Sequence, residues 1–285
     1  MGNLFGALGQ LCRMIKIEHS VFALPWAWAG ACLAARGLPP FRAFLFLTVG
    51  MIGVRSFAMT FNRIVDLPFD RDNPRTKGRP LVTGRITVSQ AWAFCAFMAA
   101  LFILSCACLN SVCLCLSVPA LLMAAIYSLL KRVTHLCHFW LGATLGLAPL
   151  AGWLSVSPSA MNASPVMLFL GVTFWVGAFD IYYSFQDVAF DRSAGLHSIP
   201  ADLGRDAALA IAGFSHAMTA VFLLLIGLVA ELSPIWYAVS CGIAILLLLE
   251  HRLMLPRDLA HVNTAFFTLN GIISPVVLAG VLLGL

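Results

Sequence analysis

Three oxygen-bearing side chains recur at every fourth residue near the end of an apolar run. They are Asn62, Asp66 and Asp70, and on a helix this spacing stacks them on one face. Carboxylate and amide oxygens bind hard divalent cations, so the spacing outlines a cation site. Basic side chains that can hold phosphate oxygens follow shortly after, at Arg71, Arg75, Lys77 and Arg79. The stretch 57–84 is therefore expected to bind a metal and a phosphorylated ligand.

A second stretch repeats part of this pattern. Residues 190–192 read Phe-Asp-Arg, as residues 69–71 do, and Asp187 precedes Asp191 by the spacing that separates the first two aspartates. The likeness hints at an internal duplication. Paired carboxylates suit Mg²⁺, which keeps waters and completes its octahedral shell with substrate phosphates. The alternative is that these aspartates are interfacial charges that pair with nearby arginines.

The composition indicates an integral membrane protein. Of the 285 residues, 61% are hydrophobic and 10% are charged, against roughly 25% charged in soluble domains. Apolar runs of about 20 residues fit helices that cross a ~30 Å hydrocarbon core, and they lack the alternation of a β-barrel. We expect one all-α, polytopic domain over residues 1–285, with about nine helices around a central cavity. The expected spans are 20–36, 42–61, 88–108, 111–130, 135–154, 164–184, 207–229, 233–250 and 264–284.

The basic residues predict the orientation of these spans. Of the 17 Lys and Arg, only Arg36 and Arg42 fall in outer loops and Arg55 falls within a span, if the N-terminus is inside. This asymmetry supports the number of spans and an orientation with the N-terminus and the Asp-rich stretches on the cytoplasmic side, and we expect the membrane to be the bacterial cytoplasmic membrane. It also explains the net charge of +5 without a nucleic-acid partner.

The two Asp-rich stretches predict a particular chemistry when they face one cavity. A diphosphate that Mg²⁺ bridges to both carboxylate pairs, with Lys and Arg on its outer oxygens, becomes a better leaving group. If the attached group is allylic, its departure leaves a delocalised carbocation, which requires aromatic walls and exclusion of water. Aromatic residues are 11% of the chain, and composition alone assigns none of them this role.

Four segments in order make the whole chain resemble the UbiA superfamily of intramembrane prenyltransferases. They read KIEHSVFALPWAWAGA, NRIVDLPFDRDNPRTKGRPL, YSLLKRVTHLCHFWLGATLGLAPLAGW and FDIYYSFQDVAFDRSAGLHSIP. The resemblance implies that two Asp-rich motifs bind an isoprenyl diphosphate through Mg²⁺ and that an aromatic acceptor is prenylated. The NR opening and the GLHSIP ending look most like enzymes of quinone biosynthesis, which act on 4-hydroxybenzoate or on 1,4-dihydroxy-6-naphthoate.

The resemblance also implies roles for individual residues. The metal and diphosphate ligands would be Asn62, Asp66 and Asp70 in the first motif and Asp187 and Asp191 in the second. Side chains of the diphosphate and prenyl pocket would be Tyr127, Ser128, Lys131 and Arg132, with Arg75, Lys77 and Arg79 closing on the diphosphate and Arg192 beside the second motif. Arg63 departs from the family, since many relatives have Asp after the Asn, and this leaves the number of metal ions open.

Three further polar residues each have two interpretations. Arg55 lies seven residues before Asn62 and is expected to neutralise a carboxylate or touch substrate, or else to reach a backbone carbonyl. Asp180 is expected to position the acceptor or make the cavity polar, or else to pair with an arginine. His19 could contact the acceptor's carboxylate or hydroxyl, or cap a helix. The remaining histidines are expected to be structural, except that His197 and Ser198 could help to close the second loop.

The predicted function is transfer of a polyprenyl group from polyprenyl diphosphate to an aromatic quinone precursor. Two alternatives stay open at this stage. One is a transporter or binding protein for an anionic lipid, which would place its polar site near mid-membrane. The other is a phosphatase that acts on polyprenyl diphosphate. The sequence does not identify the acceptor, the prenyl chain length, the group that removes the ring proton or the oligomeric state.

Overall fold

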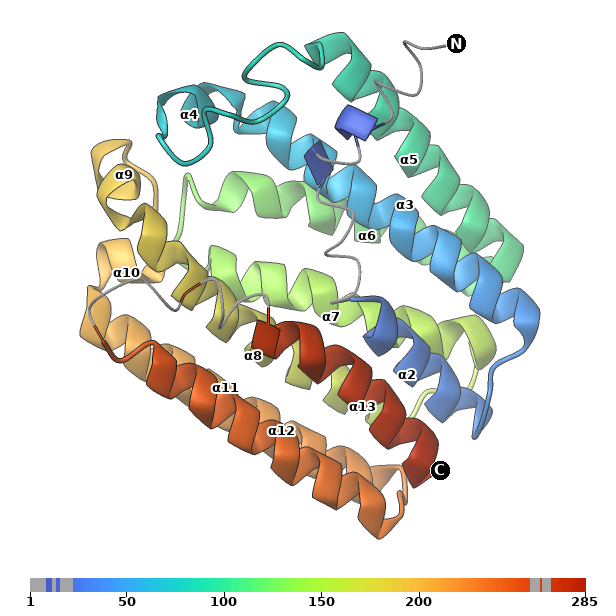
Figure 1. The fold of residues 1–285 in the computed structure, drawn as a ribbon. Coiled ribbons are helices and arrows are strands. Elements are labelled where there is room, and N and C mark those ends of the chain that lie inside the picture. The colour runs from blue at the N-terminus through green and yellow to red at the C-terminus, as the bar shows by residue number, and fades with distance from the viewer. Residues whose placement is uncertain (1–8, 12–13, 16–22, 257–261, 263–267) are drawn as a thin grey trace.

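The computed structural model describes residues 9–11, 14–15, 23–256, 262 and 268–285. Every regular element in these ranges is helical, so the predicted all-α class is confirmed (Figure 1). The helices are α2 (Leu24–Ala35), α3 (Phe41–Val65), α4 (Leu67–Asp72), α5 (Val88–Leu109), α6 (Ser111–Leu130), α7 (Cys137–Val156), α8 (Ala163–Ser184), η2 (Phe185–Asp187), α9 (Val188–Ser193), α10 (Ile199–Asp202), α11 (Arg205–Val229), α12 (Pro234–Leu253) and α13 (Asn270–Gly284).

Seven of the described helices are long and apolar enough to cross a membrane: α3, α5, α6, α7, α8 with its extension to Ser193, α11 and α12. The first and last predicted spans correspond to the shorter apolar helices α2 and α13, and residues 20–22 and 264–267 of those spans lie outside the described residues. The chain is an integral membrane protein.

The helix directions bring three connections to the same end of the bundle. The connections follow α3, α6 and α8, and Figure 1 shows α4, α9 and α10 gathered at this end. Arg36 and Arg42 lie at the other end, where they donate to the backbone oxygens of Ala230 at 2.6 Å and Cys108 at 3.0 Å. The described basic residues are therefore divided between the two ends of the bundle as their sequence distribution predicted.

Buried tryptophans join the helices that enclose one half of the molecule. Helices α2, α7, α8, α11, α12 and α13 pack in succession around a shared apolar core. Helices α3 and α6 lie beside α7, and α5 packs on α3 and α6. Trp26 on α2 donates to Ser274 Oγ on α13 at 3.1 Å, and Trp175 on α8 donates to Asn270 Oδ1 at 2.6 Å. Each indole nitrogen is thus hydrogen-bonded while its rings fill the core.

Small residues bring α7 and α8 into backbone contact. A Cβ at Gly142 would lie 2.2 Å from the Thr173 carbonyl oxygen, and one at Gly146 would lie 2.8 Å from the Phe169 carbonyl oxygen. Glycine at a helix interface permits this approach in a membrane bundle. This close contact, which we call the α7–α8 seam, fixes the relative positions of α7 and α8.

Gly142→Ala is expected to destabilise the protein because its new methyl group overlaps the backbone of α8. Overpacking of this kind costs about 1–3 kcal/mol. Gly242→Ala on α12 is the matched control, since a Cβ there meets nothing within 4 Å, and it should raise stability by about 0.5–1 kcal/mol. Thermal unfolding midpoints in detergent micelles measure both changes. Equal midpoints for the two variants would contradict the proposed seam.

Candidate active site

A cavity of about 380 Å³ opens between α3, α6, α7 and α8 and continues under the loops at the end of the bundle that carries α4 and α9. Its inner walls are mainly apolar and include Met51, Val54, Leu141, Leu145 and Ala148. Its outer walls are charged. The residues predicted from the sequence that line it are Arg55, Asn62, Asp66, Asp70, Arg75, Arg79, Tyr127, Ser128, Lys131, Arg132, Asp180, Asp187 and Asp191.

The first Asp motif follows a nearly continuous helical path with one break. Helix α3 ends at Val65, and Asp66 stands directly before the short helix α4, whose second residue is Pro68. Proline cannot donate a helical hydrogen bond, which explains the break. The amide of Asp66 still donates to the Asn62 carbonyl oxygen at 2.9 Å, and that of Asp70 donates to the Asp66 carbonyl oxygen at 2.8 Å. The predicted common face therefore survives the break.

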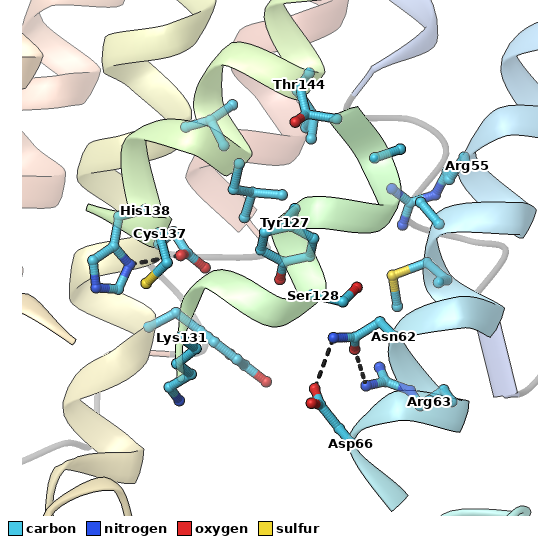
Figure 2. Close-up of a pocket in the computed structure, with 18 of the residues that line it drawn as sticks. Arg55, Asn62, Arg63, Asp66, Tyr127, Ser128, Lys131, Cys137, His138 and Thr144 are labelled. Atoms are coloured by element: carbon cyan, nitrogen blue, oxygen red, sulfur yellow. Dashed lines mark hydrogen bonds and ion pairs between the residues drawn. The ribbon is translucent and has the colours of Figure 1, made fainter. Parts of the chain in front are cut away.

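Asn62 links Asp66 to Arg63. Its Nδ2 donates to Asp66 Oδ2 at 2.7 Å, and its Oδ1 accepts from Arg63 Nη1 at 2.9 Å. Figure 2 shows these three side chains facing the space that also receives Tyr127, Ser128 and Lys131 from α6. Burial and the neighbouring Asp70 raise the pKa of Asp66 to about 6, and a cation bound beside it would favour the charged form.

The second Asp motif has the same local arrangement as the first. Helix α8 gives way to a 3₁₀ turn, Phe185–Asp187, and then to α9. Asp187 directly precedes α9 as Asp66 directly precedes α4, and Asp191 and Asp70 are each the fourth residue of their short helix. The matching sequence patterns thus correspond to matching structures on two walls of one cavity.

Each of the four motif carboxylates has a basic partner. Arg79 Nη1 lies 2.6 and 2.5 Å from the Asp70 oxygens, Lys131 Nζ lies 2.7 Å from Asp191 Oδ1, and Arg132 lies 3.7 Å from Asp66. The aspartates therefore do pair with basic residues, as the alternative interpretation expected. These carboxylates and their basic partners nevertheless line the same cavity. Burial lowers the pKa of Lys131, yet Asp191 outweighs it and raises that pKa on balance.

Arg75 joins the two motifs directly. Its Nε donates to Asp187 Oδ1 at 2.9 Å and its Nη2 to Asp187 Oδ2 at 2.6 Å, although Arg75 belongs to the loop after the first motif. Asn73 Nδ2 donates to the same carboxylate at 3.2 Å. Sequence reasoning missed Asn73, whose buried amide has no distinguishing spacing.

The loop after α9 holds three neighbouring groups in place. Gly195 has a φ of +64°, a conformation that glycine adopts without strain. Beyond this turn, Ser198 Oγ donates to Asp191 Oδ2 at 3.1 Å. The amide of His197 donates to the Lys131 carbonyl oxygen at 2.7 Å, and the amide of Ile199 donates to His138 Nε2 at 3.2 Å. His138 was expected to be structural, because a lone histidine gives no spacing signal.

Two residues assigned to the substrate site from the sequence do not line the cavity. Lys77 is exposed and outside the lining. Arg192 is also outside it, because its Nε donates at 2.9 Å to the Ala201 carbonyl oxygen. Lys77 and Arg192 therefore do not line the cavity in this structure, and their predicted contacts with the diphosphate stay a prediction. His19 lies outside the described residues.

The donor set suits a divalent cation shared with a ligand. Within the described part of the chain, no three His, Cys, Asp or Glu side chains gather as a complete metal-binding group. Mg²⁺ does not require one, since it is bound through one or two carboxylates plus substrate phosphates and waters. Two carboxylate pairs on facing walls, with cations beside them, meet that requirement.

Comparison with known proteins agrees with this geometry. The sequence profile of the UbiA prenyltransferase family matches residues 23–272. A 4-hydroxybenzoate octaprenyltransferase of Providencia stuartii is 31% identical over 90% of each chain. The apo structure of a UbiA homologue from Aeropyrum pernix K1 is 34% identical, covers 93% of this chain and 97% of its own, and has a TM-score of 0.85.

A more distant structure has the same fold. It is a UbiA homologue from Archaeoglobus fulgidus bound to GPP and Mg²⁺, at 21% identity and a TM-score of 0.73, covering 97% of this chain and all of its own. The family match covers both Asp motifs and the cavity between them. The chain belongs to the UbiA prenyltransferase family.

Proposed function

We propose that this protein transfers a polyprenyl group from polyprenyl diphosphate to a ring carbon of 4-hydroxybenzoate, with Mg²⁺ as cofactor. The observation that carries the proposal is one cavity with two carboxylate pairs and their cations at its mouth and apolar walls inside. Such a cavity suits a substrate with a charged head and a long hydrocarbon tail. The name of the Providencia stuartii relative supports the acceptor.

The candidate metal ligands are Asp66 and Asp70 on one wall and Asp187 and Asp191 on the other, with Asn62 holding Asp66. Bound there, Mg²⁺ would supply the positive charge that stabilises a departing diphosphate. Arg75, Arg79 and Lys131 can hold the outer oxygens of the diphosphate by charge-assisted hydrogen bonds. The carboxylates that pair with these basic residues are the proposed metal ligands. One diphosphate can therefore contact both the metal ion and the basic residues.

The inner cavity would receive the organic parts of both substrates. Leu141, Leu145 and Ala148 supply an apolar wall that excludes water from an allylic cation. We assign Arg55 to the acceptor's carboxylate, because it lines the cavity from α3 and lies deeper in the bundle than the first motif. Tyr127 and Ser128 on α6 would contact the head of the prenyl chain.

The proposed setting is the cytoplasmic membrane of a bacterium, with both motifs on the cytoplasmic side. The excess of Lys and Arg at the end of the bundle that carries the motifs supports this orientation. Diphosphate substrates made in the cytoplasm would then meet the cavity mouth, while the prenyl chain enters among the apolar helices.

An assay of the purified protein with a polyprenyl diphosphate, Mg²⁺ and either acceptor tests the proposal. We expect prenylated 4-hydroxybenzoate, at least about tenfold more than prenylated 1,4-dihydroxy-6-naphthoate, because the Providencia stuartii relative is named for that acceptor. Removing Mg²⁺ with a chelator should stop the reaction. Prenyl alcohol or monophosphate as the product would instead support the phosphatase, and flux across proteoliposomes without conversion would support the transporter.

A further inference from the structure

One cavity aspartate differs from the four in the motifs. Asp180 on α8 lines the cavity, and its side chain is 22% exposed. Among the described residues its partner is His138 at the start of α7, whose Nδ1 lies 2.7 Å from Asp180 Oδ2. Each motif aspartate has an arginine or lysine partner. Asp180 is therefore the cavity carboxylate that is held by an imidazole.

The hydrogen bonds determine which nitrogen of His138 carries the hydrogen. The amide of Ile199 donates to His138 Nε2 at 3.2 Å, so Nε2 is the acceptor. A neutral imidazole then has its hydrogen on Nδ1 and donates it to Asp180 Oδ2. Because His138 is 2% exposed, water does not compete for either bond. One oxygen of Asp180 is thus fixed, which also orients the other.

The backbone around this pair is held on two sides. His138, Gly142 and Gly146 follow one another at four-residue spacing on α7, along the seam where α7 touches α8. On the other side, Ile199 is the first residue of α10 and directly follows Ser198, which holds Asp191. The carboxylate of Asp180 is consequently held by a histidine whose own helix and ring are both fixed.

The depth of Asp180 places it beside an acceptor ring. It lies seven positions before Asp187, and Arg55 lies eleven positions before Asp66. At 1.5 Å per residue these separations are about 10 and 16 Å along the helices. Both helices line the cavity, and with the two motifs taken as one level, a ring whose carboxylate is bound by Arg55 would extend about 6 Å toward the diphosphate to reach the level of Asp180.

We propose that Asp180 accepts the proton that the aromatic ring loses, and that His138 is its positioning residue. The inference rests on the proposed function. The allylic C–O bond breaks and its electron pair leaves with the diphosphate, and a ring π pair forms the new C–C bond. The C–H electrons then return to the ring while the proton passes to the Asp180 carboxylate, which releases it to water after the product leaves.

Steady-state kinetics with ordinary and ring-deuterated 4-hydroxybenzoate test this role in the full-length protein. We expect Asp180→Asn to lower kcat by about 10²–10⁴-fold and to leave KM for the prenyl diphosphate nearly unchanged. Because ring deprotonation would become slow, a deuterium isotope effect on kcat should appear or increase. Asp206→Asn is the control, since Asp206 is exposed and outside the cavity lining.

Variants of His138 separate positioning from packing. His138→Gln can keep one donor and one acceptor and should retain more kcat than His138→Leu, which keeps neither. Asp180→Glu tests the carboxylate if Asp180→Asn does not fold, and it should show reduced activity with an isotope effect. A wild-type kcat in Asp180→Asn, or a rise only in the acceptor's KM without an isotope effect, would overturn the inference. Absence of prenylated aromatic product from the wild type would instead overturn the proposed function.

Discussion

Asp70→Asn is expected to reduce kcat/KM by at least about 10²-fold, comparable to the loss of an electrostatic contact to the transition state. The variant keeps the shape of the side chain but removes the charge that binds Arg79 and, by our proposal, Mg²⁺. Asp72→Asn is a matched control two positions away on the same short helix. Asp72 is exposed and does not line the cavity, so its substitution should change kcat/KM by less than about twofold.

The kinetic pattern distinguishes a role in ionisation from a role in folding. Asp70→Asn should keep a wild-type unfolding midpoint within a few degrees, since Asp70 lies at the membrane-flanking end of the bundle. A higher concentration of the aromatic acceptor should not restore the activity that Asp70→Asn loses. Similar activities for Asp70→Asn and Asp72→Asn would show that the first motif acts only through its surface charge.

Arg75→Ala should raise KM for the prenyl diphosphate and lower kcat, with a combined loss in kcat/KM of at least about 10²-fold. The reason is that Arg75 both reaches Asp187 across the cavity mouth and lines the cavity. Lys77→Ala is the matched control, because Lys77 belongs to the same loop but does not line the cavity. Steady-state rates at varied prenyl diphosphate measure both. Equal losses in the two variants would mean that the loop acts as a diffuse positive charge.

The sequence predicted the spans and the Asp motifs because both depend on regular periods. Apolar runs of membrane length specify helices, and four-residue spacing specifies a shared face. The motif aspartates followed from these two rules alone. The same rules missed the break at Asp66, although Pro68 signals it, because the amide bonds from Asp66 and Asp70 preserve the spacing across the break.

The contacts between distant segments could not be predicted in this way. Arg75 and Lys77 are equivalent in charge and occupy an irregular loop without a period, so only the folded structure separates them. Arg75 pairs with an aspartate 112 residues away. His138 gave no signal, because its role depends on Asp180 from α8 and Ile199 at the start of α10.

The central claim is that two Asp motifs on separate helices form one diphosphate site. Equilibrium binding of an unreactive prenyl thiolodiphosphate tests it most directly, with and without Mg²⁺, in the wild type, Asp70→Asn, Asp187→Asn and the double variant. The account predicts Mg²⁺-dependent binding that each single substitution weakens by at least about tenfold. The double variant should lose less binding free energy than the sum of the single losses. Wild-type affinity in either single variant, or fully additive losses, would contradict it.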